Sequence, residues 1–119
     1  MPTQAPRWVR WWFRTAALYG ALALAPQYLM PPPAPAAALV HYGFIGTALA
    51  FQIVFWIVGG DPVRYRPLML ASVAEKLAFG IPGILLATSG GAPAIVLPFA
   101  AIDLILGAGF LFAWHATRA

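Results

Sequence analysis

The chain contains no cysteine and very little charge. Only 8% of its 119 residues are charged, and just three of them are acidic. The lack of cysteine excludes disulfides, thiolate metal sites and cysteine nucleophiles. A soluble domain normally carries about 25% charged residues. The chain has too few charges to cover the surface of a soluble domain, so we expect lipid to be its main solvent.

Signatures of catalysis are also missing from the sequence. No glycine-rich phosphate loop occurs, and His41, His115 and the three acids show no spacing typical of metal ligands. Ser72 and Ser89 have no histidine base nearby in the topology predicted below. We therefore expect no enzymatic activity, and we predict no metal and no cofactor.

Apolar residues make up 62% of the sequence, and the mean hydropathy is +0.82. They gather in runs that approach or exceed the roughly 20 residues needed to cross a bilayer. These runs predict four transmembrane helices, at residues 13–30, 36–58, 67–88 and 94–114. The expected fold is a single all-α domain over residues 1–119, a four-helix transmembrane bundle. The basic start and Ala34-Pro-Ala36 also resemble parts of a signal peptide, but the first apolar run is longer than a signal core.

Arginine and tryptophan dominate the region before the first apolar run. The residues concerned are Arg7, Trp8, Arg10, Trp11, Trp12 and Arg14. Tryptophan prefers the headgroup zone of a membrane and arginine pairs with lipid phosphate. We expect this short N-terminal segment to lie at the membrane interface, in contact with lipid headgroups or a partner. A nucleic-acid-binding arm would use similar residues, but this segment runs directly into a membrane span, so no nucleic-acid partner is predicted.

The positions of the arginines predict the orientation in the membrane. Three precede the first span, Arg64 and Arg66 lie between the second and third, and Arg118 follows the fourth. Cytoplasmic segments retain Lys and Arg. Both termini are therefore predicted to be cytoplasmic, in a multi-pass protein of a bacterial inner membrane. We expect Arg64 and Arg66 to contact headgroups as well.

Charged side chains also occur well inside the predicted spans. Lys76 lies nine residues after Pro67, about 13 Å from the cytoplasmic edge, and Asp103 lies about 16 Å from the same edge. An isolated charge in hydrocarbon is costly. Two antiparallel neighbouring helices would hold the two groups at similar depth, so a Lys76–Asp103 pair is predicted.

Glu75 and Gln52 complete this predicted polar cluster. On a helix Glu75 points about 100° away from Lys76, which predicts a poor partner. Gln52 lies at a similar depth and could hydrogen-bond Glu75; a protonated Glu75 is the alternative. The cluster has three interpretations: helix packing, a proton relay or polar ligand site, and contact with a partner subunit.

His41 follows Ala37 by four residues in the second predicted span. This spacing resembles the Ala-x-x-x-His pattern of helices that ligate bacteriochlorophyll. A lone histidine near a membrane edge is also found as a hydrogen-bonded packing residue. Contact with a ligand or pigment and simple packing are the two interpretations of His41.

Three motifs together resemble a known family. Asp61-Pro-Val-Arg-Tyr-Arg-Pro67, Glu75-Lys76 and Asp103-Leu-Ile-Leu-Gly107 are similar to segments of small bacterial four-helix membrane proteins of the DoxX-like type. The likeness covers about residues 39–114. It implies a compact four-helix membrane bundle and, through the better-known members, a loose link to quinone-linked oxidation. The Trp-rich start and the Pro31–Pro35 connector depart from the pattern of that family.

The expected role is a structural or accessory subunit within a larger membrane assembly, respiratory or photosynthetic. The expected partners are the lipid bilayer and other membrane subunits or further copies of this chain. The alternative is a small proton-coupled carrier or a quinone-linked membrane component that uses Glu75, Lys76 and Asp103.

Overall fold

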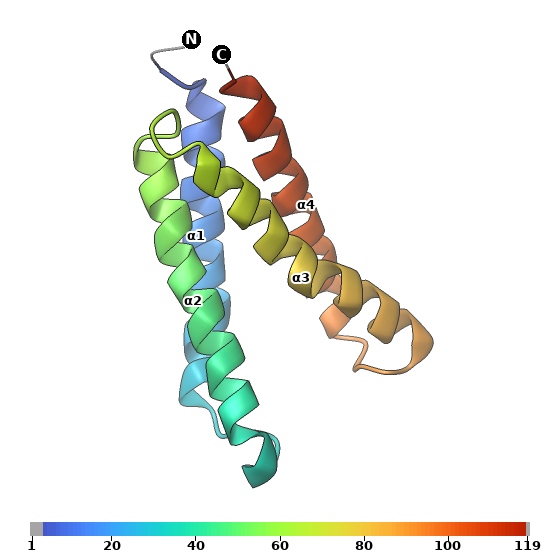
Figure 1. The fold of residues 1–119 in the computed structure, drawn as a ribbon. Coiled ribbons are helices and arrows are strands. Elements are labelled where there is room, and N and C mark those ends of the chain that lie inside the picture. Colours follow the sequence, from blue (N-terminus) through green and yellow to red (C-terminus); the bar gives the residue numbers. More distant parts are fainter. Residues whose placement is uncertain (1–3, 119) are drawn as a thin grey trace.

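The structure, a computed structural model, describes residues 4–118 and is entirely helical there, with no strand in that range (Figure 1). The helices are α1 (Arg7–Leu29), α2 (Ala38–Gly60), α3 (Pro67–Ser89) and α4 (Val96–Ala116), with a 3-10 helix η1 (Pro35–Ala37) before α2. The all-α expectation is confirmed. Residues 1–3, part of the predicted interfacial segment, and residue 119 lie outside the described range.

Three of these elements are long and apolar enough to cross a membrane. They are the continuous stretch Pro35–Gly60, which joins η1 to α2, then α3 and α4. α1 has 23 residues, as many as α2 and α3. It is not among the three candidates, and its first eight residues include three arginines. Three of the four predicted spans are therefore helices with the length and apolar composition that a membrane crossing needs.

The predicted boundaries of the last three spans agree with the observed helices to within two residues. α1 differs, because it begins at Arg7 and not at Phe13. The Trp/Arg-rich segment thus continues into the first predicted span without a break in the helix. Residues 7–19 contain no proline or glycine, so nothing in the sequence interrupts the helix between the two segments.

Proline and glycine end the helices at the connections. Three consecutive prolines follow α1, and their missing N–H groups prevent the helix from continuing. α3 ends at Ser89 and is followed by Gly90, which has a φ of +83°. This left-handed conformation suits glycine, and it lets the Gly91 N–H donate to the Leu86 carbonyl at 2.8 Å.

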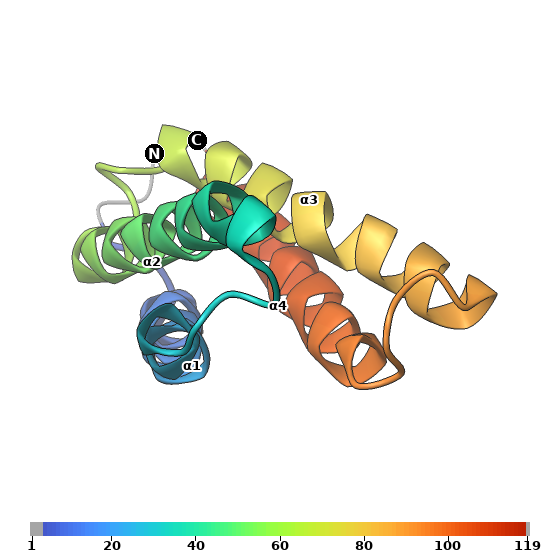
Figure 2. The same ribbon diagram turned by 90° about the horizontal axis from the view of Figure 1, so that it is seen from below.

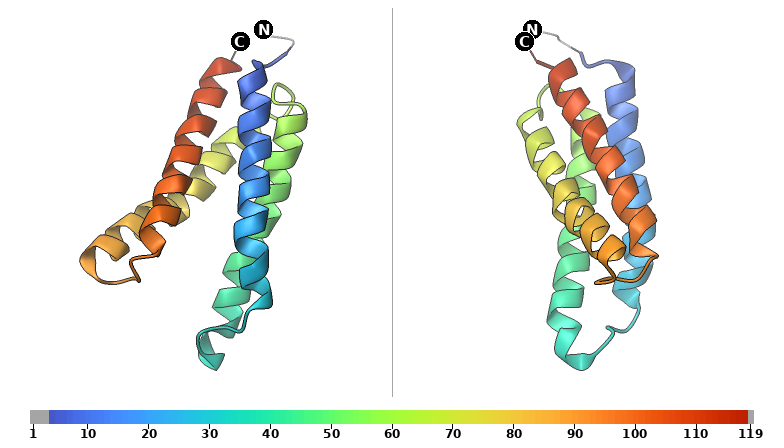
Figure 3. Two further views of the ribbon diagram at one scale, coloured as in Figure 1. Left: turned by 180° about the vertical axis from the view of Figure 1, so that it is seen from behind. Right: turned by 90° about the vertical axis from the view of Figure 1, so that its right-hand side faces the viewer.

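The helices form two antiparallel hairpins, α1–α2 and α3–α4 (Figure 1). Both termini lie at one end of the molecule, together with the connection between α2 and α3. The hairpins are in contact at this end, which we call the terminal end. They diverge towards the opposite end, as the view from behind shows (left panel of Figure 3). From below, the connection between α3 and α4 lies far to one side of α1 and α2 (Figure 2).

An aromatic core joins the hairpins at the terminal end. The Phe13 and Phe110 rings are stacked with centroids 4.3 Å apart, and the Phe55 ring lies 4.9 Å from Phe110. Val9 and Met69 are fully buried beside them. Residues from all four helices thus pack together here, and this packing sets the angle at which the hairpins diverge.

Glycines allow close approach where the helices cross. The Trp12 indole N–H donates to the Leu106 carbonyl at 3.0 Å, so α1 is tied to α4. A Cβ at Gly109 would collide with the Trp12 ring, and one at Gly80 would lie 2.6 Å from Leu104. Small residues are therefore required at both contacts, as is typical of helix packing in membranes.

Candidate functional site

A cleft of about 800 Å³ lies between the two hairpins where they diverge. Its lining comes from all four helices. Apolar side chains form most of it, and the polar lining residues include Gln52, Glu75, Lys76 and Asp103. We call these four residues the polar cluster. They are the same four that the sequence predicts as an intramembrane polar group.

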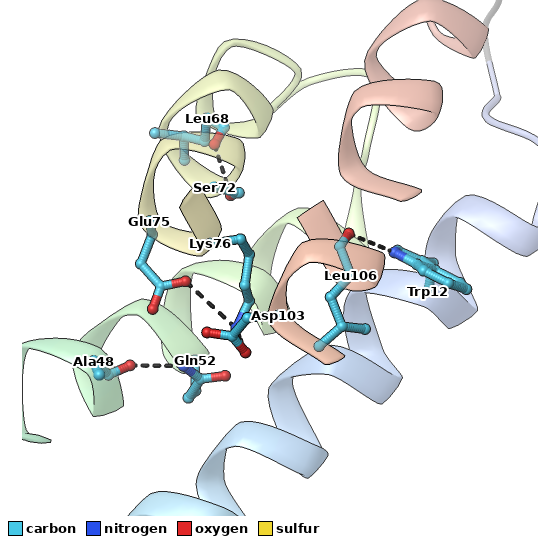
Figure 4. Close-up of polar contacts among 9 residues, drawn as sticks. All are labelled: Trp12, Ala48, Gln52, Leu68, Ser72, Glu75, Lys76, Asp103 and Leu106. Atoms are coloured by element: carbon cyan, nitrogen blue, oxygen red, sulfur yellow. Dashed lines mark hydrogen bonds and ion pairs between the residues drawn. The ribbon is translucent and has the colours of Figure 1, made fainter. Parts of the chain in front are cut away.

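Lys76 lies at the centre of the polar cluster and is almost fully buried, with 3% of its side chain exposed. Its Nζ is 3.4 Å from Oδ1 of Asp103 on α4. The two residues lie on adjacent antiparallel helices, as expected (Figure 4). Gly107 faces the Lys76 stem, and a Cβ there would lie 2.9 Å from the lysine Cβ. This small residue lets α3 and α4 approach closely enough for the pair to form.

Glu75 is a second partner of the same ammonium group. Its Oε2 also lies 3.4 Å from Lys76 Nζ. The expectation that adjacent positions on a helix make poor partners is therefore wrong here. The reason is side-chain length, because four methylene groups let the ammonium reach back towards a neighbour whose Cβ points elsewhere. Two carboxyl groups thus share one ammonium.

Gln52 does not form the predicted hydrogen bond with Glu75. Its Nε2 donates to the Ala48 carbonyl one turn earlier, at 2.7 Å. Its Oε1 is buried and has no hydrogen-bond partner among the described residues, and neither has Glu75 Oε2. Gly20 of α1 makes room for the amide, because a Cβ there would collide with it. The crossing of α1 and α2 therefore holds Gln52 at the cleft.

The base of the cleft borders the aromatic core. Lys76 Nζ lies 5.1 Å from the centroid of the Phe55 ring, within the range of a cation–π contact. Ser72, one turn before Lys76, is fully buried and donates to the Leu68 carbonyl at 2.8 Å. The polar cluster therefore lies between the packed core and the open part of the cleft.

Aromatic residues line the walls of the cleft, and sequence reasoning did not identify them. They are Tyr19, Phe44, Phe51, Phe79 and Phe99. Nothing in the spacing of these residues separates a cleft wall from a lipid-facing or core position, since all are apolar and lie on apolar helices. Only the divergence of the hairpins assigns them to the site.

His41 lies apart from this site, near the start of α2. It is not among the residues that line the cleft. Its ring lies 5.1 Å from the Tyr42 ring in an edge-to-face arrangement, and its Nε2 is buried without a hydrogen-bond partner among the described residues. Contact of His41 with a ligand or pigment stays a prediction.

Four predicted headgroup residues form a second, smaller groove of about 510 Å³ at the terminal end. Arg7, Arg10, Trp11 and Arg14 line it from α1. Arg10 Nη1 donates to the Gly60 carbonyl at 2.7 Å and Arg14 Nε to the Trp56 carbonyl at 2.9 Å. These contacts place positive charge at the carbonyl end of α2, which the helix dipole favours.

The remaining predicted headgroup residues divide between exposed and inward positions. Trp8 is exposed, Arg64 is exposed, and Arg66 donates twice to the Trp114 carbonyl, at 3.0 and 2.8 Å. Trp12 differs from its expectation, because its indole turns inward to Leu106. A helix has several faces, so tryptophans that are adjacent in sequence cannot all face the headgroups.

The chemistry available at the polar cluster is ionic and hydrogen-bonding. It combines two carboxyl groups, one ammonium group and one amide with an unpartnered oxygen. Within residues 4–118, no group of three histidine or acidic residues is arranged to hold a metal ion. The cluster can therefore exchange protons, or hold a polar head group that supplies hydrogen-bond donors.

Comparison of this chain with protein-family models, with curated protein sequences and with solved structures found no match. The resemblance to DoxX-like proteins stays a prediction.

Proposed function

We propose that this chain is a multi-pass protein of a bacterial inner membrane that binds a small amphipathic molecule in the cleft between its hairpins. The single observation that carries the proposal is the polar cluster at the base of an otherwise apolar cleft. Ligand pockets combine mostly apolar walls with a few polar groups, and their volumes are typically about 300–1,000 Å³. Ionisable residues inside a membrane cost free energy and are commonly functional.

The membrane arrangement in this proposal has four spans, with both termini in the cytoplasm. α1 is the fourth span because its 23 residues extend about 34 Å, and it packs antiparallel to α2 (Figure 1). The six arginines belong to the first part of α1, to the connection between α2 and α3, and to the residues after α4, and the other two connections have none. The positive-inside rule then favours a cytoplasmic terminal end. The cleft opens towards the other side of the membrane.

The accessory-subunit role is the second candidate, and a different observation favours it. The α3 wall of the cleft includes Ala71, Ala74 and Ala78, which are spaced like one face of a helix. Small residues in such a row let a second helix approach closely. A transmembrane helix of a partner subunit, or of another copy of this chain, would fit against that wall.

Single cysteines distinguish these candidates, because the chain has no cysteine of its own. A maleimide reacts with the thiolate, which forms in a hydrated site and not in hydrocarbon. In native membranes, Ala74→Cys should react with N-ethylmaleimide if the cleft is open. Leu77→Cys is the matched control on the same helix, since Leu77 is 41% exposed and does not line the cleft.

The same labelling tests the orientation. Gly91→Cys should react with an impermeant maleimide added outside intact cells, whereas Val63→Cys should not. Reaction of Val63→Cys from outside contradicts the four-span arrangement. If Ala74→Cys is as unreactive as Leu77→Cys, the open cleft is wrong and the accessory-subunit role is favoured.

A further inference from the structure

The charges of the polar cluster do not balance. Glu75 and Asp103 supply two carboxyl groups, and Lys76 supplies the ammonium group between them. With all three ionised, the site carries one uncompensated negative charge in a largely apolar cleft. An unpaired charge in such surroundings costs several kcal/mol. A single positive charge, a proton or a cationic ligand, would remove that cost.

The hydrogen bonds of the cluster are also incomplete. Gln52 is only 4% exposed, and its Oε1 accepts no hydrogen bond from the described residues. Glu75 Oε2 is buried and forms the 3.4 Å ion pair with Lys76 Nζ, but that contact does not have the geometry of a hydrogen bond. Both atoms are acceptors, and buried polar groups normally have partners. The missing group is therefore a donor.

The cleft walls suit an organic cation. Five aromatic residues line the cleft above the cluster, and aromatic faces attract cations while they bury apolar groups. A carboxylate or phosphate head would add negative charge to a site that already has an excess. An alcohol would supply a donor but would leave the charge unbalanced.

We propose that the ligand of this cleft is an amphipathic amine in its protonated form, which takes the place of one proton held by Glu75 and Asp103. The inference rests on the proposed function, because it names the ligand class for the same cleft. The ammonium head would donate a hydrogen bond to Gln52 Oε1 and pair with the Glu75 carboxyl group beside Lys76, and the apolar tail would lie among the aromatic walls.

The exchange conserves charge. Before binding, one proton on the two carboxyl groups makes the cluster neutral together with Lys76. The incoming cation displaces that proton to water, and the occupied site is again neutral. The titratable groups that line the cleft are Tyr19 on α1, Glu75 and Lys76 on α3, and Asp103 on α4; α2 contributes Gln52, which does not titrate.

Three probes that share one tail test the ligand class: 4-phenylbutylamine, its trimethylammonium analogue and 4-phenylbutan-1-ol. Calorimetry on the full chain in an uncharged detergent should show binding of the amine with release of one proton. The alcohol should bind at least about tenfold more weakly, because charge-assisted hydrogen bonds are stronger than neutral ones. The quaternary cation should lie between them, since it has charge and no donor.

The pH dependence has a definite sign. The amine stays protonated up to about pH 9, as lysine does, so any change between pH 6 and 8 reports on the protein. Raising the pH removes the competing proton, and amine affinity should increase by up to about tenfold per pH unit. Binding of the alcohol should not change.

Substitutions in the polar cluster distinguish an effect of charge on amine binding from an effect of misfolding. Glu75→Gln leaves one carboxyl group and one ammonium group, so amine binding and proton release should both be lost. Lys76→Met should strengthen amine binding, a direction that misfolding cannot produce. Thr88→Val is the matched control for Gln52→Leu, because Thr88 also donates to the carbonyl four residues earlier, at 2.7 Å, but does not line the cleft. It should leave amine binding unchanged, whereas Gln52→Leu should weaken it several-fold.

The outcomes distinguish this inference from the proposed function. Equal affinities for the amine and the alcohol, or amine binding without proton release, overturn the inference and leave an amphipathic ligand in the cleft. Absence of amine binding to the unaltered protein overturns the inference as well. If Ala74→Cys is also unreactive in membranes, the proposed function fails with it. These probe measurements need no variant to fold.

Discussion

The two ends of the molecule use the same kinds of residue in opposite ways. At the terminal end, phenylalanines from α1, α2 and α4 pack against each other with ring centroids 4.3–6.4 Å apart. Further along the same helices, aromatic residues line an open cleft. Lipid is as apolar as a protein core, so apolar character alone does not drive helices together in a membrane. Shape complementarity closes one end, and its absence leaves the other open.

The charged side chains at the two ends of the molecule also differ in their partners. Three of the arginines near the terminal end, Arg10, Arg14 and Arg66, donate hydrogen bonds to backbone carbonyls. Lys76 at the cleft pairs with two carboxyl groups, and Gln52 Oε1 at the same cleft has no hydrogen-bond partner among the described residues. Polar groups with a purely structural role find their hydrogen-bond partners within the chain. The cleft instead leaves a polar group that a ligand or a partner protein would have to bind. The predictions below test this contrast.

The largest expected effect concerns Lys76. Removal of one member of a buried ion pair typically costs about 3–5 kcal/mol. Lys76→Met strands two carboxyl groups and should lower thermal stability in detergent by more than Asp103→Leu, which leaves Glu75 beside the lysine. The double variant should be more stable than Lys76→Met alone. Strictly additive losses would exclude a direct interaction between Lys76 and Asp103.

A smaller loss of stability is expected for a core substitution at the terminal end than for Lys76→Met, and a still smaller one for a substitution in the cleft wall. Phe110→Ala creates a cavity in the core, whereas Phe99→Ala, on the same helix, removes a cleft wall that is already 41% exposed. Moving an apolar side chain between lipid and a protein core changes its free energy little. The loss of stability in Phe110→Ala should therefore come mainly from the cavity and amount to about 2 kcal/mol. Phe99→Ala should change stability by much less. Equal losses in thermal unfolding would contradict the distinction between the two ends.

The smallest effect concerns the tryptophans of α1. Trp12→Phe removes the indole donor to the Leu106 carbonyl and should cost about 0.6–1 kcal/mol. Trp11→Phe is the control, because Trp11 is 67% exposed. It should leave stability unchanged in detergent. A larger loss for Trp11 than for Trp12 would show that the tie between α1 and α4 does not depend on this hydrogen bond.

Much of the architecture could be predicted from the sequence. The helix boundaries at Pro67 and Ser89 follow from a proline before and glycines after an apolar run. The Lys76–Asp103 pair follows from depth, because both positions can be counted from the ends of helices with a constant rise. Helix boundaries and positions along a helix depend on nearby residues and on counting along the chain, so they can be predicted without a structure.

The contacts that depend on side-chain reach and helix packing were not predictable. Glu75 contacts Lys76 because a flexible stem bends back, and Gln52 bonds its own helix instead of Glu75. Trp12 turns inward because Gly109 leaves space for it on another helix. Each outcome depends on the relative rotation and spacing of two elements, which periodicity within one element does not specify.

Composition and spacing by themselves determined the helical class, the apolar segments and the presence of a polar group deep within them. The cleft was decided only by the tertiary structure. Packing of Phe13, Phe55 and Phe110 at one end holds the hairpins at an angle, and that angle opens a space at the other end. An angle between helices arises from many side chains in contact across elements, so it becomes defined only when the chain is folded.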